Sequence, residues 1–413
     1  MRWRTSLVHN VFVDTWTSSL TRRRALRHLA TFLAGSPLLR SQQDTFRDHS
    51  RIPGLNELVT AFDFEPVAYA KIPRNAYDYT ALGVEGEFTL RRNRQAFEWV
   101  ELLPRAVVDA GAVQTATEVV GTKMAFPILI SPSAGHGQLH PDGEMATHRG
   151  ATAASNTTMI VSVNSSFPIE KTAAAATGPL WYQHYPRGQD VEDNRELLER
   201  AQAVGCRAIV MTVDNQIGTG VRERSMHDRN LSPRTGPPPG ANRRPGARGV
   251  PATSPYRVSG GYPYLDWAWL EKIRPFIKVP LLVKAILSAE DARLCVERGL
   301  DGIVVSNHGG RNADYHPSTL EVLPEIVDAV QGRIPVLIDS GFRRGADVLK
   351  ALALGAKAVC LGRVARWGVA AYGPPGLQRI LEIVQNELVL AMAHTGRPTL
   401  TSIDRTLVRT DFP

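Results

Sequence analysis

The sequence is poor in cysteine and has no long hydrophobic run, and each shortage excludes a class of protein. Only three cysteines occur among 413 residues (Cys206, Cys295 and Cys360), without CxxC spacing. This excludes a disulfide scaffold and gives no support to a metal site. No run of 18 or more apolar residues is present, so a membrane-spanning helix is not expected. With 43% hydrophobic and 21% charged residues, the composition is that of a globular protein with its own core.

The net charge of +8 is concentrated in two segments. Residues 1–51 hold nine arginines and three acidic residues, and residues 218–257 hold eight arginines and two acidic residues. The rest of the chain holds 31 basic and 35 acidic side chains. Because the body of the protein is slightly acidic, the basicity does not indicate a nucleic-acid-binding surface, and we predict no nucleic-acid partner.

Residues 1–51 form a basic N-terminal extension, which we separate from a domain at residues 52–413. Arg22, Arg23 and Arg24 precede a mostly apolar stretch at 29–39, an arrangement that resembles a twin-arginine export signal. Arg27 and His28 interrupt the approach to this stretch, and no A-x-A cleavage site follows. Two interpretations therefore stay open, an export signal for the periplasm or a basic extension of a cytoplasmic protein.

From residue 128 onwards, short apolar runs alternate with amphipathic stretches, which is typical of a parallel sheet covered by helices. Strands are predicted at 128–131, 159–163, 180–185, 208–214, 281–286, 302–308, 335–341 and 358–363. Helices are predicted between them at 143–155, 191–204, 289–299, 320–330 and 345–355. Eight such units predict an α/β fold of the (β/α)8 TIM-barrel type, with a doubly wound open sheet as the alternative. Helical spacing at 55–70 and 77–97 predicts an N-terminal helical extension before the barrel.

A long connection follows the fourth predicted strand. More than forty residues, rich in glycine, proline and arginine, separate Asp214 from Tyr262. Loops of this length are usually lids, binding loops or disordered segments. Since it leaves the C-terminal end of a strand, this loop is expected at the face where barrels hold their active sites.

Polar residues gather at the C-terminal ends of the later strands, where barrel enzymes place catalytic groups. His308 and Arg311 are separated by a Gly-Gly turn, so both can face one small ligand. An imidazole accepts a proton near neutral pH, and a guanidinium matches the shape of a carboxylate. Asp214 would orient the imidazole and stabilise its protonated form. These residues predict a carboxylate substrate that loses a proton from a neighbouring C–H or O–H.

The ends of the last two predicted strands look like a phosphate site. Barrels commonly bind phosphate at the loops after strands seven and eight, where backbone N–H groups point at the anion. Gly341 and Gly362 would let the backbone approach closely, and Arg343 and Arg363 would add charge-assisted hydrogen bonds. The pattern predicts a phosphorylated cofactor or substrate.

These residues resemble a known family, the FMN-dependent 2-hydroxy-acid oxidases and dehydrogenases. The resemblance is carried by Ser306-Asn307-His308-Gly309-Gly310-Arg311 with Asp314, Ala76-Tyr77-Asp78-Tyr79, Ile130-Ser131-Pro132-Ser133-Ala134 and His140-Pro141-Asp142-Gly143-Glu144. Further matches are Tyr182-Gln183-His184-Tyr185, Thr212-Val213-Asp214, Val283-Lys284 and the stretch from Asp339 to Arg344. It covers about residues 53–405 and implies FMN as cofactor.

The resemblance implies a role for each matching residue. His308 would be the base, Asp214 would hold its imidazolium, and Tyr185 would hydrogen-bond near the reacting centre. Arg311, Tyr79 and Arg222 would bind the substrate carboxylate. Lys284 would lie by the pyrimidine edge of the flavin and stabilise the anionic reduced cofactor. Contacts to the flavin ring are implied for Ser133, Ala134, Ser162, Gln183 and Thr212, with Ser306 close by. The ribityl chain and phosphate would be held by Asp339, Gly341, Arg343, Gly362 and Arg363.

The implied reaction is the oxidation of an (S)-2-hydroxy acid, similar to lactate, glycolate or mandelate, to the 2-oxo acid. The electron acceptor stays open between O2 and a quinone or another carrier, and the family is commonly tetrameric, which suggests a homotetramer. Two other interpretations stay open. One is another FMN barrel enzyme, an isomerase or nucleotide dehydrogenase, and the other is a non-catalytic flavin-binding protein.

Several positions depart from the pattern of the resembled family. Asn312 replaces a glutamine, Ser340 replaces a glycine, and Asn215-Gln216 replaces Thr-Pro. Asn164 stands where many members have a bulky aromatic residue, and His184 stands where an apolar residue is common. We expect these changes to affect which acid is accepted, either because the loss of the aromatic residue opens the pocket or because His184 fills it.

Overall fold

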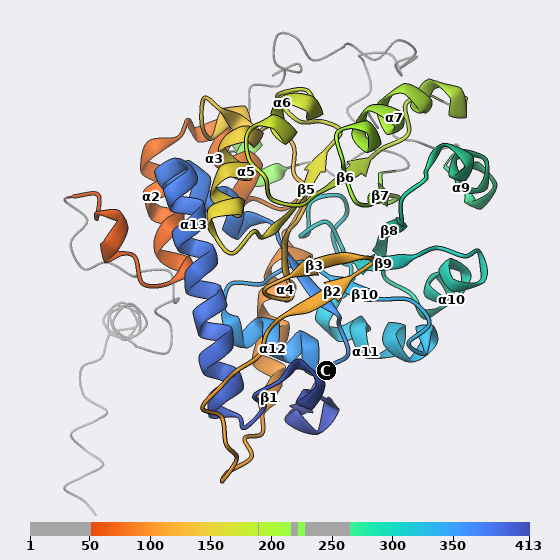
Figure 1. Cartoon of the computed structure of the whole chain (residues 1–413). Coiled ribbons are helices and arrows are strands. Elements are labelled where there is room, and N and C mark those ends of the chain that lie inside the picture. Colours follow the sequence, from red (N-terminus) through yellow and green to blue (C-terminus); the bar gives the residue numbers. More distant parts are fainter. Residues whose placement is uncertain (1–50, 189, 216–221, 228–264) are drawn as a thin grey trace, which may run out of the picture. The chain divides into compact units, whose positions relative to one another are not determined.

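A computed structural model describes residues 51–188, 190–215, 222–227 and 265–413 (Figure 1). The twin-arginine-like segment and most of the long loop after Asp214 lie outside the described residues, so both interpretations of the N-terminal extension stay open. Within the described ranges, no helix is both long enough and apolar enough to cross a membrane.

Eight parallel strands close into a barrel in the order β10-β11-β4-β5-β6-β7-β8-β9. The strands are β4 (Ile128–Ile130), β5 (Thr158–Ser162), β6 (Leu180–His184), β7 (Ile209–Thr212), β8 (Leu281–Ile286), β9 (Gly302–Val305), β10 (Val336–Ile338) and β11 (Ala358–Leu361). The predicted (β/α)8 barrel is confirmed, and the open sheet is wrong because β11 pairs with β4 in parallel and closes the sheet.

Apolar side chains from alternate positions of these strands fill the barrel. Leu129, Ile160, Trp181 and Val304 belong to one buried cluster. A two-stranded hairpin, β2 (Thr117–Val119) and β3 (Thr122–Met124), packs against the same cluster. The Trp181 Nε1 donates a hydrogen bond of 2.9 Å to the hydroxyl of Thr122 within this hairpin. The barrel interior is therefore a packed core. The polar side chains that could act on a ligand lie at the carboxyl ends of the strands.

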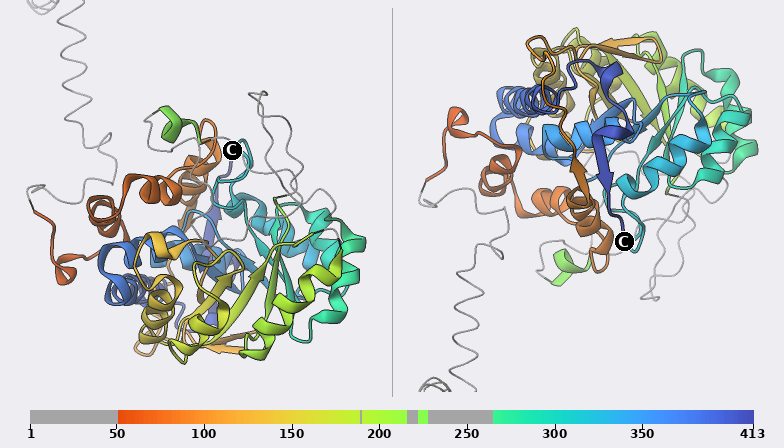
Figure 2. Two further views of the ribbon diagram at one scale, coloured as in Figure 1. Left: turned by 90° about the horizontal axis from the view of Figure 1, so that it is seen from above. Right: turned by 90° about the horizontal axis from the view of Figure 1, so that it is seen from below.

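The outer helices confirm the predicted alternation, and Figure 2 shows them around the barrel from two sides. They are α5 (Gly143–Ala153), α6 (Ile169–Ala174), α7 (Arg195–Ala203, preceded by a 3-10 turn at Val191–Asn194), α9 (Trp267–Ile273), α10 (Ala289–Glu297), α11 (Thr319–Val330) and α12 (Gly345–Ala353). Serine hydroxyls cap two of them, since Ser288 and Ser318 accept backbone N–H groups of the first turns of α10 and α11. These caps satisfy donors that a helix start leaves without intrahelical partners.

The segment before the barrel, residues 52–127, is helical in its first part, but its helices are shorter than predicted. It contains α2 (Phe64–Lys71), α3 (Arg74–Ala81) and α4 (Phe88–Gln95), with 3-10 turns at Leu55–Glu57, Ala61–Asp63 and Ala96–Trp99. The predicted region 77–97 is interrupted because the N–H of Val84 donates to the carbonyl of Gly310 instead of continuing a helix. Helix α3 is thereby held at the carboxyl ends of the strands.

The C-terminal part adds a helix that the strand pattern did not predict. Helix α13 (Arg363–His394) begins directly after β11 and changes direction at Tyr372 and Gly373. It packs against α2, α5 and α12 (Figure 1). The last strand, β12 (Val408–Thr410), pairs antiparallel with β1 (Val100–Leu102) and so joins the C-terminal residues to the segment that precedes the barrel.

Candidate active site

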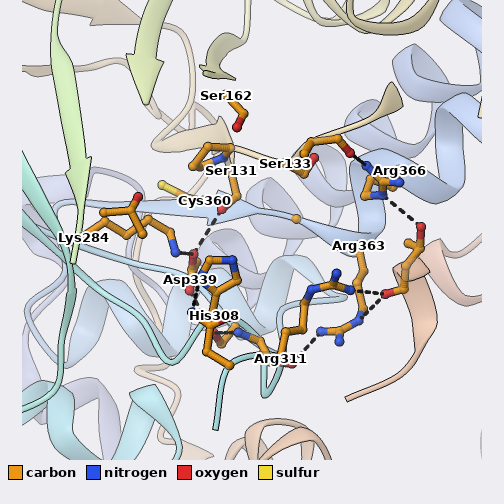
Figure 3. A pocket seen from close by; sticks show the side chains of 18 of the residues that line it. Ser131, Ser133, Ser162, Lys284, His308, Arg311, Asp339, Cys360, Arg363 and Arg366 are labelled. Carbon is orange, nitrogen blue, oxygen red and sulfur yellow. Dashed lines mark hydrogen bonds and ion pairs between the residues drawn. The ribbon is translucent and has the colours of Figure 1, made fainter. Parts of the chain in front are cut away.

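A cavity of about 330 Å³ opens at the carboxyl ends of the barrel strands. Its volume lies in the range of sites for small molecules and cofactors. Figure 3 shows His308, Lys284, Arg311 and Arg363 among the side chains that line it. Residues from β4 to β11, the start of α13 and helix α3 all contribute to the lining.

The turn after β9 presents His308 and Arg311 to the cavity because its backbone is left-handed at three successive residues. The φ angles of His308, Gly309 and Gly310 are 56°, 67° and 71°. A Cβ atom at Gly309 would lie 2.6 Å from the Arg363 guanidinium, and one at Gly310 would lie 2.7 Å from the backbone nitrogen of Leu90. Both glycines are therefore required by conformation and by packing.

Two other residues of the same motif, Asn307 and Asp314, hold helix α4 in place. Asn307 and Asn93 exchange reciprocal side-chain hydrogen bonds of 2.7 and 2.8 Å. Asp314 accepts the backbone N–H groups of Phe88 and Thr89 at the start of α4. Because α4 follows α3, these contacts also position Tyr79, which the sequence assigned to the substrate site.

His308 and Asp214, which the sequence predicted to act together, are in direct contact. The Nδ1 of His308 lies 3.0 and 3.1 Å from the two carboxylate oxygens of Asp214. Burial would raise the pKa of Asp214, but the neighbouring His308 outweighs it and lowers that pKa below its usual value. The side-chain amide of Asn312 donates to the backbone carbonyl of Asp214 and so helps to fix the position of Asp214. With Nδ1 committed to Asp214, Nε2 is the nitrogen that can act on a ligand.

Three guanidinium groups surround the ring of Tyr79. The Cζ atoms of Arg311, Arg222 and Arg366 lie 4.5, 4.9 and 5.2 Å from its centroid. Arg311 also donates to the backbone carbonyl of Tyr79. Burial would raise the pKa of the Tyr79 phenol, but the three guanidinium groups reverse this and lower it.

The same crowding acts on the arginines. Burial, reinforced by the charge of Arg311, lowers the pKa of Arg222 and of Arg366 to about 10. The Nε of Arg222 and one terminal nitrogen of Arg366 are buried without a hydrogen-bond partner among the described residues. Cations held together in this way favour the binding of an anion, which would pair with them and reduce their mutual repulsion.

The floor of the cavity carries hydrogen-bonding groups that suit a flavin ring. Lys284 donates to the hydroxyl of Ser306 at 2.8 Å, and its Nζ lies 3.4 Å from an Asp339 carboxylate oxygen. The Nε2 of Gln183 and the hydroxyl of Thr212 are buried without a partner in the described part of the chain. Because unpaired buried polar groups are costly, a ring with several donors and acceptors fits this surface.

The loops after β10 and β11 differ in how they could receive a phosphate. Burial lowers the pKa of Arg343, and burial with the charge of Arg311 lowers that of Arg363 well below its usual value. A Cβ atom at Gly362 would meet only the Cβ of Ser131, at 3.8 Å, so its missing side chain leaves room in the cavity. At Gly341, with φ +85°, a Cβ atom would lie 2.2 Å from the carbonyl oxygen of Asn93. Packing against α4 therefore excludes a side chain at Gly341, whereas the cavity has room for one at Gly362. Both glycines line the cavity, and their roles toward the cofactor stay predictions.

This contrast leads to a prediction about two glycine variants. A Gly362→Leu variant is expected to fold with a melting temperature close to that of the wild type but to bind FMN at least about tenfold more weakly, since its side chain enters the cavity. A Gly341→Ala variant is expected to lower the melting temperature by several degrees, because alanine is strained at φ +85° and collides with α4. Thermal unfolding of the apoproteins and FMN titration followed by fluorescence measure both effects. Equal FMN affinity in Gly362→Leu and wild type would contradict the assignment.

Most residues that the sequence proposed for the site lie together in the cavity lining. They are Tyr79, Ser133, Ala134, Ser162, Gln183, Tyr185, Thr212, Arg222, Lys284, His308, Arg311, Asp339, Gly341, Arg343, Gly362 and Arg363. Asp214 and Ser306 are not among the lining residues. Asp214 contacts the lining residue His308, and Ser306 contacts the lining residue Lys284. The roles assigned to all of these residues remain predictions.

Two buried residues beside the cofactor surface were missed by the sequence reasoning. Arg366 lines the cavity and donates to the Thr80 hydroxyl and the Ala134 carbonyl. His136 lies behind Ser133, with its ring nitrogens 2.6 Å from the Ser133 and Thr147 hydroxyls. Burial, helped by Arg366, lowers the pKa of His136 well below its usual value. The one available signal for Arg366 was its position three residues after Arg363, one helical turn further on.

His184 does not fill the substrate pocket, as one of the two interpretations of its position suggested. It alternates with the cavity-lining Gln183 and so points away from the barrel interior. Its Nε2 lies 2.8 Å from the Asn194 side-chain oxygen, before helix α7. Asn164, in contrast, lines the cavity.

The burial of His184 predicts a loss of stability in acid. Burial lowers the pKa of His184 to about 4 from the usual 6.5, so the unfolded chain takes up a proton that the folded chain refuses. Stability is full above pH 6.5 and falls by about 3 kcal/mol as the pH drops to 4. Urea unfolding at pH 7 and pH 4.5 should therefore show a smaller acid-induced loss for His184→Gln than for the wild type. Equal losses would show that His184 does not cause this dependence.

The cavity has a surface that suits a flavin, a cluster of cations around Tyr79 that attracts an anion, and His308 held by Asp214. These features define a class of protein, the FMN-binding barrel oxidoreductases. Residues 68–410 match the family model of FMN-dependent dehydrogenases. The chain belongs to this family, and FMN is its cofactor.

Relatives and solved structures agree with this. The chain is 40% identical over 362 residues to a peroxisomal (S)-2-hydroxyacid oxidase (GLO3) of Arabidopsis thaliana, covering 86% of this chain and 98% of that protein. It is 37% identical over 363 residues to a glycolate oxidase of Spinacia oleracea, covering 86% and 97%. A crystal structure of mandelate oxidase with benzoylformic acid superposes with a TM-score of 0.74 at 34% identity, covering 86% and 99%.

Proposed function

We propose that this enzyme oxidises an (S)-2-hydroxy acid to the 2-oxo acid. The observation that carries the proposal is that His308, held by Asp214, lines the same cavity as Arg311, beside the surface that suits a flavin. Removing a proton from a substrate whose reacting carbon is next to a carboxylate requires a base, with a cation nearby to bind that carboxylate. The names of the relatives, which are oxidases of 2-hydroxy acids, glycolate and mandelate, support the same reaction.

Each residue has a defined task in this reaction. Arg311 and Arg222 bind the substrate carboxylate, assisted by Tyr79. His308 accepts a proton from the substrate through Nε2, and the carboxylate of Asp214 stabilises the imidazolium that forms. Tyr185 hydrogen-bonds near the reacting carbon, and Lys284 contributes positive charge beside the cofactor.

The reaction removes two electrons and two protons from the substrate, one each from the C2–H and the hydroxyl. FMN, when bound, supplies the redox chemistry by accepting the electron pair. We propose O2 as the final acceptor, since the relatives are named oxidases; a quinone or another carrier is the alternative. A homotetrameric assembly remains a prediction from the family resemblance.

An anaerobic screen of the FMN-loaded enzyme tests the proposal. Glycolate, (S)-lactate, (S)-mandelate and longer 2-hydroxy acids are added in turn, and bleaching of the flavin absorbance is followed. At least one acid should reduce the flavin as fast as the enzyme turns over. The reduced flavin should then be reoxidised faster by O2 than by a quinone analogue. Flavin that no hydroxy acid reduces would overturn the proposal and favour an isomerase, a nucleotide dehydrogenase or a flavin-binding protein without this activity.

A further inference from the structure

We infer that the substrate of this enzyme carries a hydroxyl or similar hydrogen-bonding group on its side chain, beyond the carbon that is oxidised. Two asparagine side chains, Asn164 and Asn215, would receive this group. The inference rests on the proposed function, because it assumes that the carboxylate of a 2-hydroxy acid binds at Arg311. It specifies a class of polar, hydroxylated 2-hydroxy acids and disfavours acids with alkyl or aryl side chains.

The two asparagines belong to one wall of the cavity. Asn164 follows β5 by two residues, Tyr185 comes directly after β6, and Asn215 follows β7 by three residues. These three strands are neighbours in the barrel, paired in parallel through β6. All three residues line the cavity. We call Asn164, Tyr185 and Asn215 the polar wall.

The polar wall lies where a bound hydroxy acid would direct its side chain. Arg311 follows β9, and β5 is four strands from β9 in either direction around the eight-stranded barrel. The backbone that carries Arg311 is thus on the opposite side of the barrel from the backbone that carries Asn164. An acid held by its carboxylate at Arg311, with C2 beside His308, extends its remaining carbons toward the polar wall.

Among the described residues, the asparagine side chains of this wall have no hydrogen-bond partner. The Oδ1 of Asn215 is buried and accepts no hydrogen bond from the described residues. Asn164 uses its backbone N–H, which donates to the Ser162 hydroxyl, whereas no bond of its side-chain amide occurs in the described ranges. Asn312, by comparison, donates its amide to the Asp214 carbonyl. A buried amide oxygen without a donor is costly, and a substrate hydroxyl would satisfy it.

The departures from the family pattern point in the same direction. A bulky aromatic residue at position 164 and Thr-Pro at 215–216 would present mostly apolar surface to a substrate side chain. This chain has an amide at position 164 and another at position 215. A site that hydrogen-bonds a substrate hydroxyl discriminates strongly against the analogue that lacks it, whereas an apolar pocket discriminates only weakly against an added hydroxyl.

The test compares (S)-lactate with (S)-glycerate, which differ by one hydroxyl on C3. For the FMN-loaded wild type we expect kcat/KM for glycerate to exceed that for lactate by at least about tenfold. In Asn164→Leu and Asn215→Leu, which keep side-chain size but lose the amide, the ratio should fall toward one, mainly through glycerate. Asn386→Leu, at an exposed position on α13, is the matched control and should keep the wild-type ratio.

A binding measurement that does not depend on turnover complements the kinetics. Calorimetric titration of the FMN-loaded enzyme with 3-hydroxypropanoate and propanoate, which have no hydroxyl at C2, should show tighter binding of the hydroxylated acid in the wild type. That preference should be lost in the two polar-wall variants. Lactate oxidised as well as glycerate, with equal binding of the two analogues, would overturn the inference and leave the proposed function intact. If no hydroxy acid reduces the flavin, the proposed function itself fails.

Discussion

Replacement of His308 by alanine is expected to lower kcat for hydroxy-acid oxidation by about 10²- to 10⁴-fold, the range typical of a positioned general base. The imidazole is held through Nδ1 by Asp214 at 3.0 Å, so its other nitrogen is oriented for proton transfer. Removal of the ring leaves the proton without this acceptor, while the groups expected to hold FMN are unchanged. The cofactor content should therefore equal that of the wild type.

Stopped-flow measurement of anaerobic flavin reduction is the appropriate assay, because it reports the step in which His308 is proposed to act. His394→Ala is a matched control, since His394 is exposed at the end of α13 and does not line the cavity. Asp214→Asn should lose part of the rate, since a neutral amide stabilises the imidazolium less than a carboxylate does. Full turnover of hydroxy acids by His308→Ala would contradict the assignment of the base.

Replacement of Arg311 by methionine is expected to lower kcat/KM by about 10²- to 10³-fold, which corresponds to about 3–4 kcal/mol of lost transition-state binding. A guanidinium can meet a carboxylate with two parallel hydrogen bonds, and that contact is strong where water is excluded. Arg311→Lys keeps the charge but loses the planar fork, so its kcat/KM should lie between those of methionine and wild type.

A substrate without a carboxylate separates this role from a general loss of structure. The wild type should prefer (S)-lactate to (S)-lactamide, and the preference should almost disappear in Arg311→Met. Arg195→Met is a suitable control, because Arg195 pairs with Glu192 on an exposed surface, where ion pairs contribute little. An unchanged lactate-to-lactamide ratio in Arg311→Met would show that the carboxylate binds elsewhere.

The barrel was predictable because its strands are buried on both faces and read as short apolar runs. The ranges 180–185 and 281–286 predicted β6 and β8 within one residue of their ends. The helix boundaries in the segment before the barrel were less predictable, because tertiary contacts end these helices. The N–H of Val84 pairs with Gly310, more than two hundred residues away along the chain, and no local pattern records such a contact.

The site shows the same division. His308, Arg311 and Lys284 were evident as polar residues at the ends of apolar strands. The structural tasks of Asn307 and Asp314 were not, because a motif does not distinguish residues that face the ligand from those that hold α4 in place. Arg366 was missed because it lies within a helix. It reaches the cavity because α13 begins at the carboxyl end of β11.

The sequence alone therefore determined the class of fold, the cofactor expected from the family resemblance and the residues that meet at the carboxyl ends of the strands. Strand and helix periods are local properties, and parallel strands bring their ends to one face whatever their lengths. Tertiary structure decided that His184 points outward, that Gly341 packs closely against α4, that Arg366 joins the cations around Tyr79, and that Asn164 and Asn215 share one wall. Those outcomes depend on which side chains are neighbours across the closed barrel, and the order of residues along the chain does not contain that information directly.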